Sequence, residues 1–456
     1  MGMRTPPSAL RRGVFEKRNE MKTSQVFNNA KWIVFCKIAQ SLIQLVIGMI
    51  SARYLGPSNY GLISYAASIV AFFLPIMRLG MNATMVRELM EAPDKEGEVV
   101  GTTLLMNVLS SILCIFGVFS VSLVANFGET ETIIVCVLYS TSIFFAALEM
   151  IQYWFQYKLL SKYSSLAMLA AYILVSIYKI FLLITKRSIY WFALSHSVEY
   201  GIIAILLIVL YIKYGSGRFS FSKSKAFEML GRSKHYILSA LMVVIFQNTD
   251  HFMLKIISGN EENGFYSAAI TCAGVVQFVY MAIIDSFRPL ILSNKKDNPK
   301  EYEKNISRLY GVITYLSFAQ SFVFTIFAWL IMSVLYGNDY TPAVPVLQIL
   351  TWYCAFSYMG SVRNIWLLAE QKQKLLPAIN LAGVFINIAL NAVMIYLWGA
   401  CGAALASLLT QIFTNLVLGF IIKPIRKNNR LLIQGLNPVF FVREVKNIIS
   451  DIRKKE

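Results

Sequence analysis

The sequence predicts an all-α integral membrane protein that crosses the bilayer about twelve times. Three observations support this class. Of the 456 residues, 57% are hydrophobic and only 14% are charged, whereas soluble domains carry about 25% charged residues. Apolar runs recur along the whole chain, and basic residues are shared unequally between alternate loops. Lipid is therefore the expected solvent of most side chains.

The membrane helices are predicted from the length of the apolar runs. A helix needs about 20 predominantly apolar residues to cross the hydrocarbon core. Glycine, proline and charge clusters separate runs of this length and mark the places where helices should end. The predicted helices are 31–51, 60–77, 101–125, 133–155, 163–184, 189–212, 236–257, 264–286, 308–336, 342–369, 376–398 and 401–423.

These helices divide the chain into five regions. Residues 1–30 form a basic cytoplasmic N-terminus that we expect to be partly disordered. This stretch lacks the apolar core of a cleavable signal peptide, and Met21 offers an alternative start of translation. The first six helices form an N-lobe at 31–212, and the last six form a C-lobe at 236–423. A cytoplasmic amphipathic linker at 213–235 joins the lobes, and a basic amphipathic tail follows at 424–456.

The net charge of +18 follows the membrane topology. With the N-terminus inside, 35 of the 42 Lys and Arg residues fall in cytoplasmic segments, and only Arg53, Lys186 and Arg187 fall in external loops. The positive-inside rule predicts this bias for a multi-pass protein with both termini in the cytoplasm. Nucleic acid is not expected as a partner, because no folded domain gathers the basic residues.

The linker and the tail both mix basic with apolar residues, which suits helices lying on an anionic cytoplasmic leaflet. Anionic membrane lipids are therefore predicted partners. A solvated basic segment that only determines the topology explains the same composition. The residues concerned are Lys213, Arg218, Phe219, Phe221, Lys223, Lys225, Phe227, Leu230, Arg232 and Lys234 in the linker, and Val442, Arg443, Val445, Lys446, Ile449, Ile452 and Arg453 in the tail.

An internal repeat relates the two lobes. The segments 53–67 and 255–269 each pass from a basic residue through a short turn to a glycine, which aromatic and small residues follow. Gly61 and Gly264, 203 residues apart, occupy the same place in the two copies. Six helices separate the copies, so both lobes enter the membrane with the same orientation. Such parallel repeats form two bundles related by a pseudo-twofold axis along the membrane normal.

The sequence does not contain the usual signatures of an enzyme. It has no phosphate-binding loop, no H-E-x-x-H motif and no paired cysteines, since its six cysteines are scattered. The external loops are only a few residues long, which argues against a membrane glycan polymerase or ligase. We therefore predict a transporter with no catalytic residue and no metal site.

Polar side chains inside the helices line up on single faces. Because unsatisfied polar groups are costly in lipid, these faces should point into a bundle or a watery cavity. The asparagines of 376–398 suit helix contacts or substrate binding, and Lys179 and Lys255 suit snorkelling as well as a cavity. The polar faces contain Lys37, Gln40, Ser41 and Gln44; His196 and Glu199; Gln247, Asp250, His251 and Lys255; Arg363 and Asn364; Asn380, Asn387 and Asn391; and Ser407, Gln411 and Asn415.

The segment 52–62, Ala-Arg-Tyr-Leu-Gly-Pro-Ser-Asn-Tyr-Gly-Leu, resembles the first-hairpin signature of bacterial polysaccharide flippases. These are Wzx-type lipid-linked oligosaccharide translocases of the MOP exporter superfamily, which share a MATE-like fold. The segments 29–32, 78–81, 86–89 and 263–269 are also similar to that family. Over the rest of the chain the resemblance consists of size, helix count and the two-lobe layout.

The resemblance implies a flippase that moves undecaprenyl-diphosphate-linked oligosaccharide from the cytoplasmic to the outer leaflet of the bacterial inner membrane by alternating access. This activity serves surface polysaccharide biosynthesis, and polysaccharide-assembly proteins are further expected partners. A cationic cavity would bind the diphosphate. Its expected residues are Lys37, Gln44, Arg53, Lys255, Arg363 and Asn364, with Arg78 and Arg288 at the cytoplasmic mouth. Arg288 lies one turn from Asp285, so a structural ion pair is the alternative there.

No cofactor is predicted other than a coupling ion, H⁺ or Na⁺. Glu199 with His196, or Asp250 with His251, would relay the proton or bind the cation. Two alternatives remain open. A cation-coupled multidrug exporter of the MATE type would need a more acidic cavity. A peptidoglycan-precursor flippase would be expected to carry helices beyond the twelve.

Overall fold

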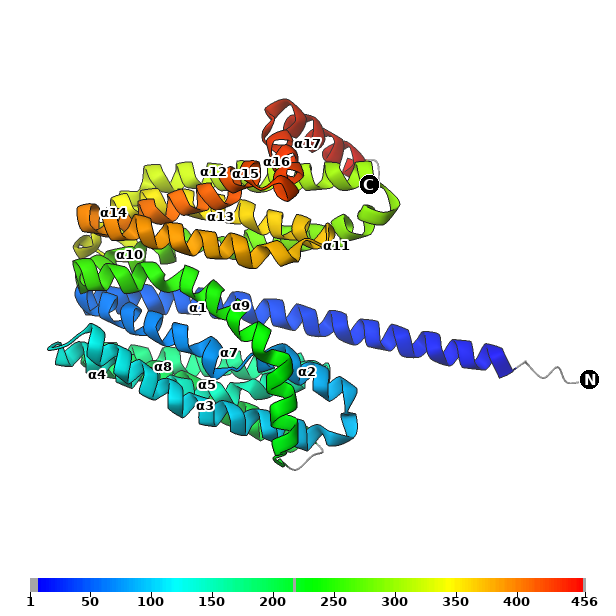
Figure 1. Ribbon diagram of the computed structural model, residues 1–456, viewed down its shortest axis with the longest axis horizontal. Helices are drawn as coiled ribbons and strands as arrows, with labels where there is room; N and C mark the ends of the chain where they lie inside the picture. Colours follow the sequence, from blue (N-terminus) through cyan, green and yellow to red (C-terminus); the bar gives the residue numbers. More distant parts are fainter. Residues whose placement is uncertain (1–6, 216–218, 454–456) are drawn as a thin grey trace, which may run out of the picture. The chain divides into compact units, whose positions relative to one another are not determined.

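The computed structural model is built almost entirely of helices (Figure 1). It describes the backbone of residues 7–215 and 219–453, and the side chains from Trp32 onward except those of residues 216–218, 235, 239, 296–297, 445 and 447–456. The helices are α1 (Pro7–Met77), α2 (Met81–Glu91), α3 (Glu96–Ala125), α4 (Thr130–Ser140), α5 (Ser142–Leu148), α6 (Gln152–Tyr157), α7 (Ser161–Ile184), α8 (Ile189–Tyr214), α9 (Lys223–Ser258), α10 (Asn260–Ala273), α11 (Gln277–Asp297), α12 (Pro299–Leu335), α13 (Ala343–Ala369), α14 (Leu376–Ile412), α15 (Leu418–Ile421), α16 (Arg426–Leu436) and α17 (Pro438–Arg453), with a π-helix at Phe413–Val417 and short 3-10 turns between some of them.

Several predictions concern residues outside this description. The N-terminus 1–30 was expected to be partly disordered. Its residues 1–6 lie outside the described residues, and α1 begins at Pro7. Arg218 of the linker, and the side chains of Val445, Ile449, Ile452 and Arg453 in the tail, also lie outside the described residues.

The membrane helices agree with the predicted class. Within the described residues, eight helices are long and apolar enough to cross a membrane, or nine if the pair α10 and α11, bent by 45°, is one span. Two of the eight are double spans with an internal kink. α1 breaks at Gly56, and α14 breaks at Trp398 and Gly399. All twelve predicted segments fall mainly on helical backbone, although 133–155 runs over α4, α5 and α6, and 264–286 runs over α10 and α11. The prediction of an all-α membrane protein is confirmed.

The chain divides into two compact units. The first unit contains Met1–Ile47, Phe73–Val121 and Val137–Ile237, and the second contains Gly48–Phe72, Ser122–Cys136 and Leu238–Glu456. The predicted lobes differ from these units at two places, because residues 48–72 and 122–136 group with the second half of the chain. Both segments lie at predicted external ends of helices.

Each unit has its own buried core, and large apolar side chains also cover the outside. In the first unit Met85, Trp154 and Phe155 are fully buried. In the second unit Tyr310 and Trp366 are fully buried. Many other aromatic and aliphatic side chains are exposed along the membrane helices, as lipid-facing positions require. Between helices in lipid, close packing and polar contacts replace the hydrophobic effect as the main source of stability.

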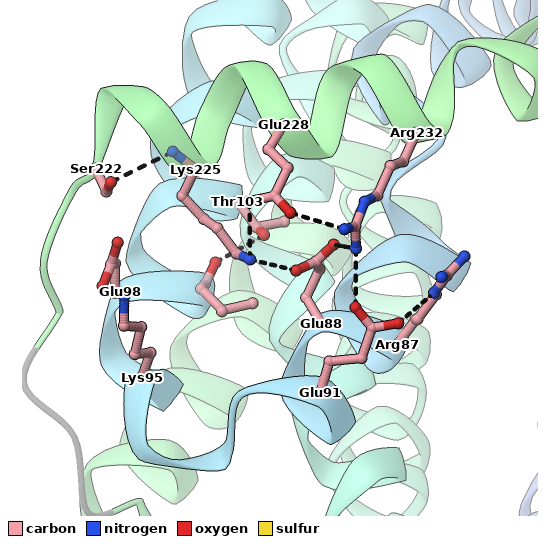
Figure 2. A network of polar contacts seen from close by, with 11 residues as sticks. Arg87, Glu88, Glu91, Lys95, Glu98, Thr103, Ser222, Lys225, Glu228 and Arg232 are labelled. Atoms are coloured by element: carbon pink, nitrogen blue, oxygen red, sulfur yellow. Dashed lines mark hydrogen bonds and ion pairs between the residues drawn. The ribbon is translucent and has the colours of Figure 1, made fainter.

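The start of α9 is held on α2 by a network of ion pairs within the first unit (Figure 2). The carboxylate of Glu88 is fully buried and lies between the ammonium of Lys225 and the guanidinium of Arg232, whose Nη1 is 2.6 Å from Oε1. Arg232 also contacts Glu91 and Glu228, at 2.9 and 2.8 Å. The Glu88 carboxylate raises the pKa of Lys225. Two basic residues of the predicted linker therefore bind carboxylates of the protein.

We expect the double variant Lys225→Met/Arg232→Met to lower the free energy of unfolding by about 3 kcal/mol, because it leaves Glu88 buried without a counter-charge. This is the low end of the usual range, since the side chain of Arg232 is 37% exposed. Adding Glu88→Gln should recover most of the loss. Thermal melting of the purified protein in detergent measures both effects. A double variant that melts like the wild type would show that the network contributes no net stability.

Candidate functional site

The two copies of the internal repeat each contain a glycine in a similar backbone conformation. Gly56 has φ 72° and ψ 169°, and Gly259, again 203 residues further on, has φ 95° and ψ −179°. Only glycine adopts this region without strain. In both copies the glycine ends one membrane helix and starts the next. The structure therefore supports the repeat at the level of backbone angles as well as residue type.

The two copies also pack against each other reciprocally within the second unit. A Cβ added at Gly61 would clash with the carbonyl oxygen of Asn260 and would lie 2.6 Å from the nitrogen of Gly264. A Cβ added at Gly264 would clash with the carbonyl oxygen of Pro57 and would lie 2.7 Å from its carbonyl carbon. Pro57 and Asn260 are themselves 203 residues apart. In addition, Asn263 donates from Nδ2 to Gly61 O at 2.7 Å. The repeat thus forms a local twofold-like contact that requires a glycine on both sides.

Lys255 is buried at this end of the second unit with a full set of partners. Its side chain is 4% exposed, its ammonium donates to Asn126 Oδ1, and it lies 2.7 Å from Glu129 Oε2. The ammonium is also 5.2 Å from the centre of the Tyr65 ring. Lys255 lowers the pKa of the Glu129 carboxyl. In this arrangement the Glu129 carboxylate balances the charge of Lys255. Binding a diphosphate at Lys255 would therefore require this ion pair to open.

Arg363 is buried and forms no ion pair with any acidic residue whose side chain the structure describes. It is 7% exposed, Nη1 donates to Thr414 O at 2.9 Å, and Nη2 donates to Asn364 Oδ1 at 3.4 Å. Its Nε has no hydrogen-bond partner, and none of the described carboxylates lies within ion-pair distance. Thr414 belongs to the π-helix Phe413–Val417. Single π-turns frequently mark functional positions in helices. Arg363 is therefore a buried cation with a free donor.

Asp250 is a buried carboxylate surrounded by hydrogen-bond donors. It is 6% exposed. Its Oδ1 accepts from Nδ2 of Asn387 at 3.1 Å and of Asn391 at 2.6 Å. Its Oδ2 accepts from the hydroxyl of Tyr266 at 2.7 Å and from that of Ser407. Four hydrogen-bond donors therefore satisfy both oxygens of this buried side chain.

The Asp250 cluster joins helices whose polar faces were predicted from the sequence one by one, without their partners. The stripe of asparagines was predicted to make helix contacts or to bind substrate, and the structure confirms helix contacts, since α14 meets α9 there. Tyr266, on α10, was not predicted as a site residue. Its place in the second copy of the repeat was the only available signal. The Oδ1 of Asn391 has no partner although the residue is fully buried, so a cation could be bound there together with Asp250.

The His251 side chain contacts residues other than the neighbouring Asp250. Its Nδ1 is 2.9 Å from Asn263 Oδ1 and 3.3 Å from Ser267 Oγ, and its ring meets that of Tyr266 edge-on at 5.1 Å. The same Asn263 contacts Gly61. His251 therefore links the Asp250 cluster to the contact between the two repeat copies.

The other predicted coupling pair lies in the first unit. Nδ1 of His196 is 3.9 Å from Oε2 of the buried Glu199, and the imidazole stacks on the Tyr139 ring with centroids 4.4 Å apart. Lys179 and Tyr172, both on α7, lie close enough to the Glu199 carboxylate to interact with it. The structure thus brings the predicted pair together and adds Lys179, for which snorkelling was the alternative.

The remaining predicted residues occupy separate places. Lys37 and Gln44 are exposed on α1 in the first unit. Arg53 is exposed and donates to Val334 O at 3.4 Å. Arg78 lies 3.7 Å from Glu149. Arg288 forms the exposed pair with Asp285 at 2.8 Å that was the alternative for this residue.

Comparison with known proteins identifies the family. The family model described as polysaccharide biosynthesis protein matches residues 26–295. A protein of Escherichia coli (strain K12), named as a candidate O-antigen transporter, is 22% identical over 421 residues, which cover 88% of this chain and 97% of that protein.

Solved structures show the same fold. The lipid II flippase MurJ in an inward closed conformation aligns with a TM-score of 0.69 and 16% identity over 91% of this chain and 93% of that chain. An inward-facing MATE family transporter of the MOP superfamily aligns with a TM-score of 0.64 and 13% identity over 89% of this chain and 99% of that chain. These relatives are transporters and flippases rather than enzymes. Since the family model covers more than half of the residues, this multi-pass membrane protein belongs to the polysaccharide biosynthesis protein family.

Proposed function

We propose that the protein is a flippase that moves an undecaprenyl-diphosphate-linked oligosaccharide from the cytoplasmic to the outer leaflet of the bacterial inner membrane. A diphosphate cannot cross hydrocarbon unaided, so such a protein must offer cations away from bulk water. Membership of the polysaccharide biosynthesis family and the MOP-type fold support the proposal. Both termini would lie in the cytoplasm, as the distribution of basic residues indicates.

Arg363 is the observation that supports an anionic cargo most directly. A guanidinium buried in a membrane protein without a carboxylate partner is costly, and a phosphate would supply the missing charge and accept from the free Nε. Lys37 and Gln44 of the first unit, and Arg53 and Asn364 of the second, remain proposed cargo contacts. Lys255 would contribute only after release from Glu129.

We expect the protein to restore surface glycan in a bacterium that lacks its own polysaccharide flippase, and Arg363→Gln to lower this activity at least about tenfold. One lost hydrogen bond to a charged group is sufficient for that change. Arg363→Lys should keep part of the activity because it retains the charge. Surface glycan is quantified by extraction and gel staining, and membrane abundance and thermal melting are measured for each variant.

The matched control is Lys374→Gln, which removes a positive charge from an exposed position outside the proposed site. Full activity of a folded Arg363→Gln variant would remove Arg363 from the cargo site. Failure of the wild type with several glycans, together with gained resistance to cationic drugs, would support the multidrug exporter instead. The buried Asp250 is the feature that favours this second function.

A further inference from the structure

The C-terminal segment is folded onto α12 rather than extending as a free tail. Tyr310 donates from its hydroxyl to Asn428 Oδ1 at 2.9 Å, and Tyr315 donates to Leu436 O at 2.7 Å. Phe441 packs on the Tyr315 ring with centroids 4.4 Å apart. Figure 1 shows α16 and α17 beside α12. This docking places α17 at a fixed position next to the first turns of α12.

A charged cavity of about 460 Å³ lies between α12 and α17. Its lining residues are Lys300, Glu303, Lys304, Gln434, Phe440, Arg443 and Glu444. Both carboxylates already have cationic partners. Glu444 is bound by Lys304 at 3.2 Å and by Arg308, and Glu303 is bound by Lys427 at 2.6 Å.

Two cations of this cavity remain. Lys300 and Arg443 are exposed, and none of the described carboxylates lies within ion-pair distance of either. The guanidinium of Arg443 lies 5.9 Å from the centre of the Phe440 ring, which restrains it at the cavity. The cavity therefore has an excess of positive charge and two donors that can meet an anion.

An apolar groove of about 550 Å³ adjoins the charged cavity and shares Arg443 with it. Its other lining residues are Pro438, Val439, Val442 and Lys446. Val439 is 77% exposed and Val442 is 51% exposed. Two exposed valines on a helix that also carries basic residues are typical of a segment lying at a membrane surface. A charged cavity next to an apolar groove matches a molecule with an anionic head and an apolar chain.

We infer that α12 and α17 form a binding site for one anionic phospholipid, with its phosphate at Lys300 and Arg443 and an acyl chain along Val439 and Val442. The membrane that the protein spans supplies such molecules at high local concentration, and basic residues beside a membrane favour anionic headgroups. Free phosphate would use only the charged half of the site. The site does not depend on the proposed cargo, so either proposal can fail alone.

Native mass spectrometry of the full-length protein in detergent tests the site, with dioleoyl-phosphatidylglycerol and dioleoyl-phosphatidylcholine as probes. The wild type is expected to bind one phosphatidylglycerol more tightly than phosphatidylcholine. Lys300→Gln and Arg443→Gln should each weaken the binding of phosphatidylglycerol about fivefold, which is the effect of one basic residue near an anionic surface. Val442→Asn should weaken binding of phosphatidylglycerol while leaving any binding of inorganic phosphate unchanged.

The control is Lys374→Gln/Lys423→Gln, which removes two exposed positive charges outside the site. If this control and Lys300→Gln/Arg443→Gln lost phosphatidylglycerol binding equally, the net charge of the protein would explain the binding and the site would be overturned. Unchanged binding in Lys300→Gln/Arg443→Gln would overturn it as well. If inorganic phosphate competed and Val442→Asn had no effect, the ligand of the site would be free phosphate and the lipid proposal would be overturned. Thermal melting verifies that each variant is folded.

Discussion

Gly264→Ala is expected to destabilise the protein severely, by about 3 kcal/mol or more. The added methyl group would clash with the carbonyl group of Pro57, so backbone would have to move, and no flexible side chain can yield instead. Gly61→Ala should have a similar effect through Asn260. Because the two variants disturb one contact, the double variant should cost less than the sum of the single ones. Thermal melting in detergent and the yield of folded protein measure these effects.

The matched control is Gly48→Ala, the same chemical change at a position where a Cβ would meet nothing within 4 Å. Alanine is preferred over glycine inside helices by about 1 kcal/mol, so this variant should be neutral or slightly stabilising. If Gly264→Ala melted like Gly48→Ala, the close contact between the two repeat copies would be refuted.

If Asp250 binds a coupling ion, Asp250→Asn is expected to abolish ion-coupled transport while leaving the cluster about the same size. The substitution removes the charge and places an amide among four donors from Tyr266, Asn387, Asn391 and Ser407. Asp250→Ala should cost more stability, about 3 kcal/mol, because the four donors then lack an acceptor. Ser407→Ala is the control that removes one donor and keeps the carboxylate.

Melting in sodium chloride and in choline chloride provides a readout besides activity. If Na⁺ binds at Asp250, sodium should raise the melting temperature of the wild type and of Ser407→Ala but not of Asp250→Asn. Transport driven by a sodium or proton gradient in proteoliposomes completes the test. Intact gradient dependence in a folded Asp250→Asn variant would transfer the coupling role to Glu199, for which Glu199→Gln is the corresponding variant.

Much of the fold could be predicted because the signals that specify membrane helices are local. The length of each apolar run and the charge of each loop can be read from the local sequence alone. Kinks are less visible. Gly56 and Gly399 join helices that hydropathy separates, and the positive φ values of these glycines depend on the contacts around them. The assignment of residues 48–72 and 122–136 to the second unit likewise depends on long-range contacts.

The sequence by itself determined the all-α membrane class, the positions of the helices, the internal repeat and the resemblance to polysaccharide flippases. Only the tertiary structure decided the partners of the buried charges. Lys255 meets Glu129, 126 residues away, and Asp250 meets Ser407, 157 residues away. Helical periodicity shows which side chains share a face, but it carries no information on which helix that face meets. For this reason Arg363, which has no partner among the described carboxylates, could be distinguished from Lys255, which has one, only after the helices were packed.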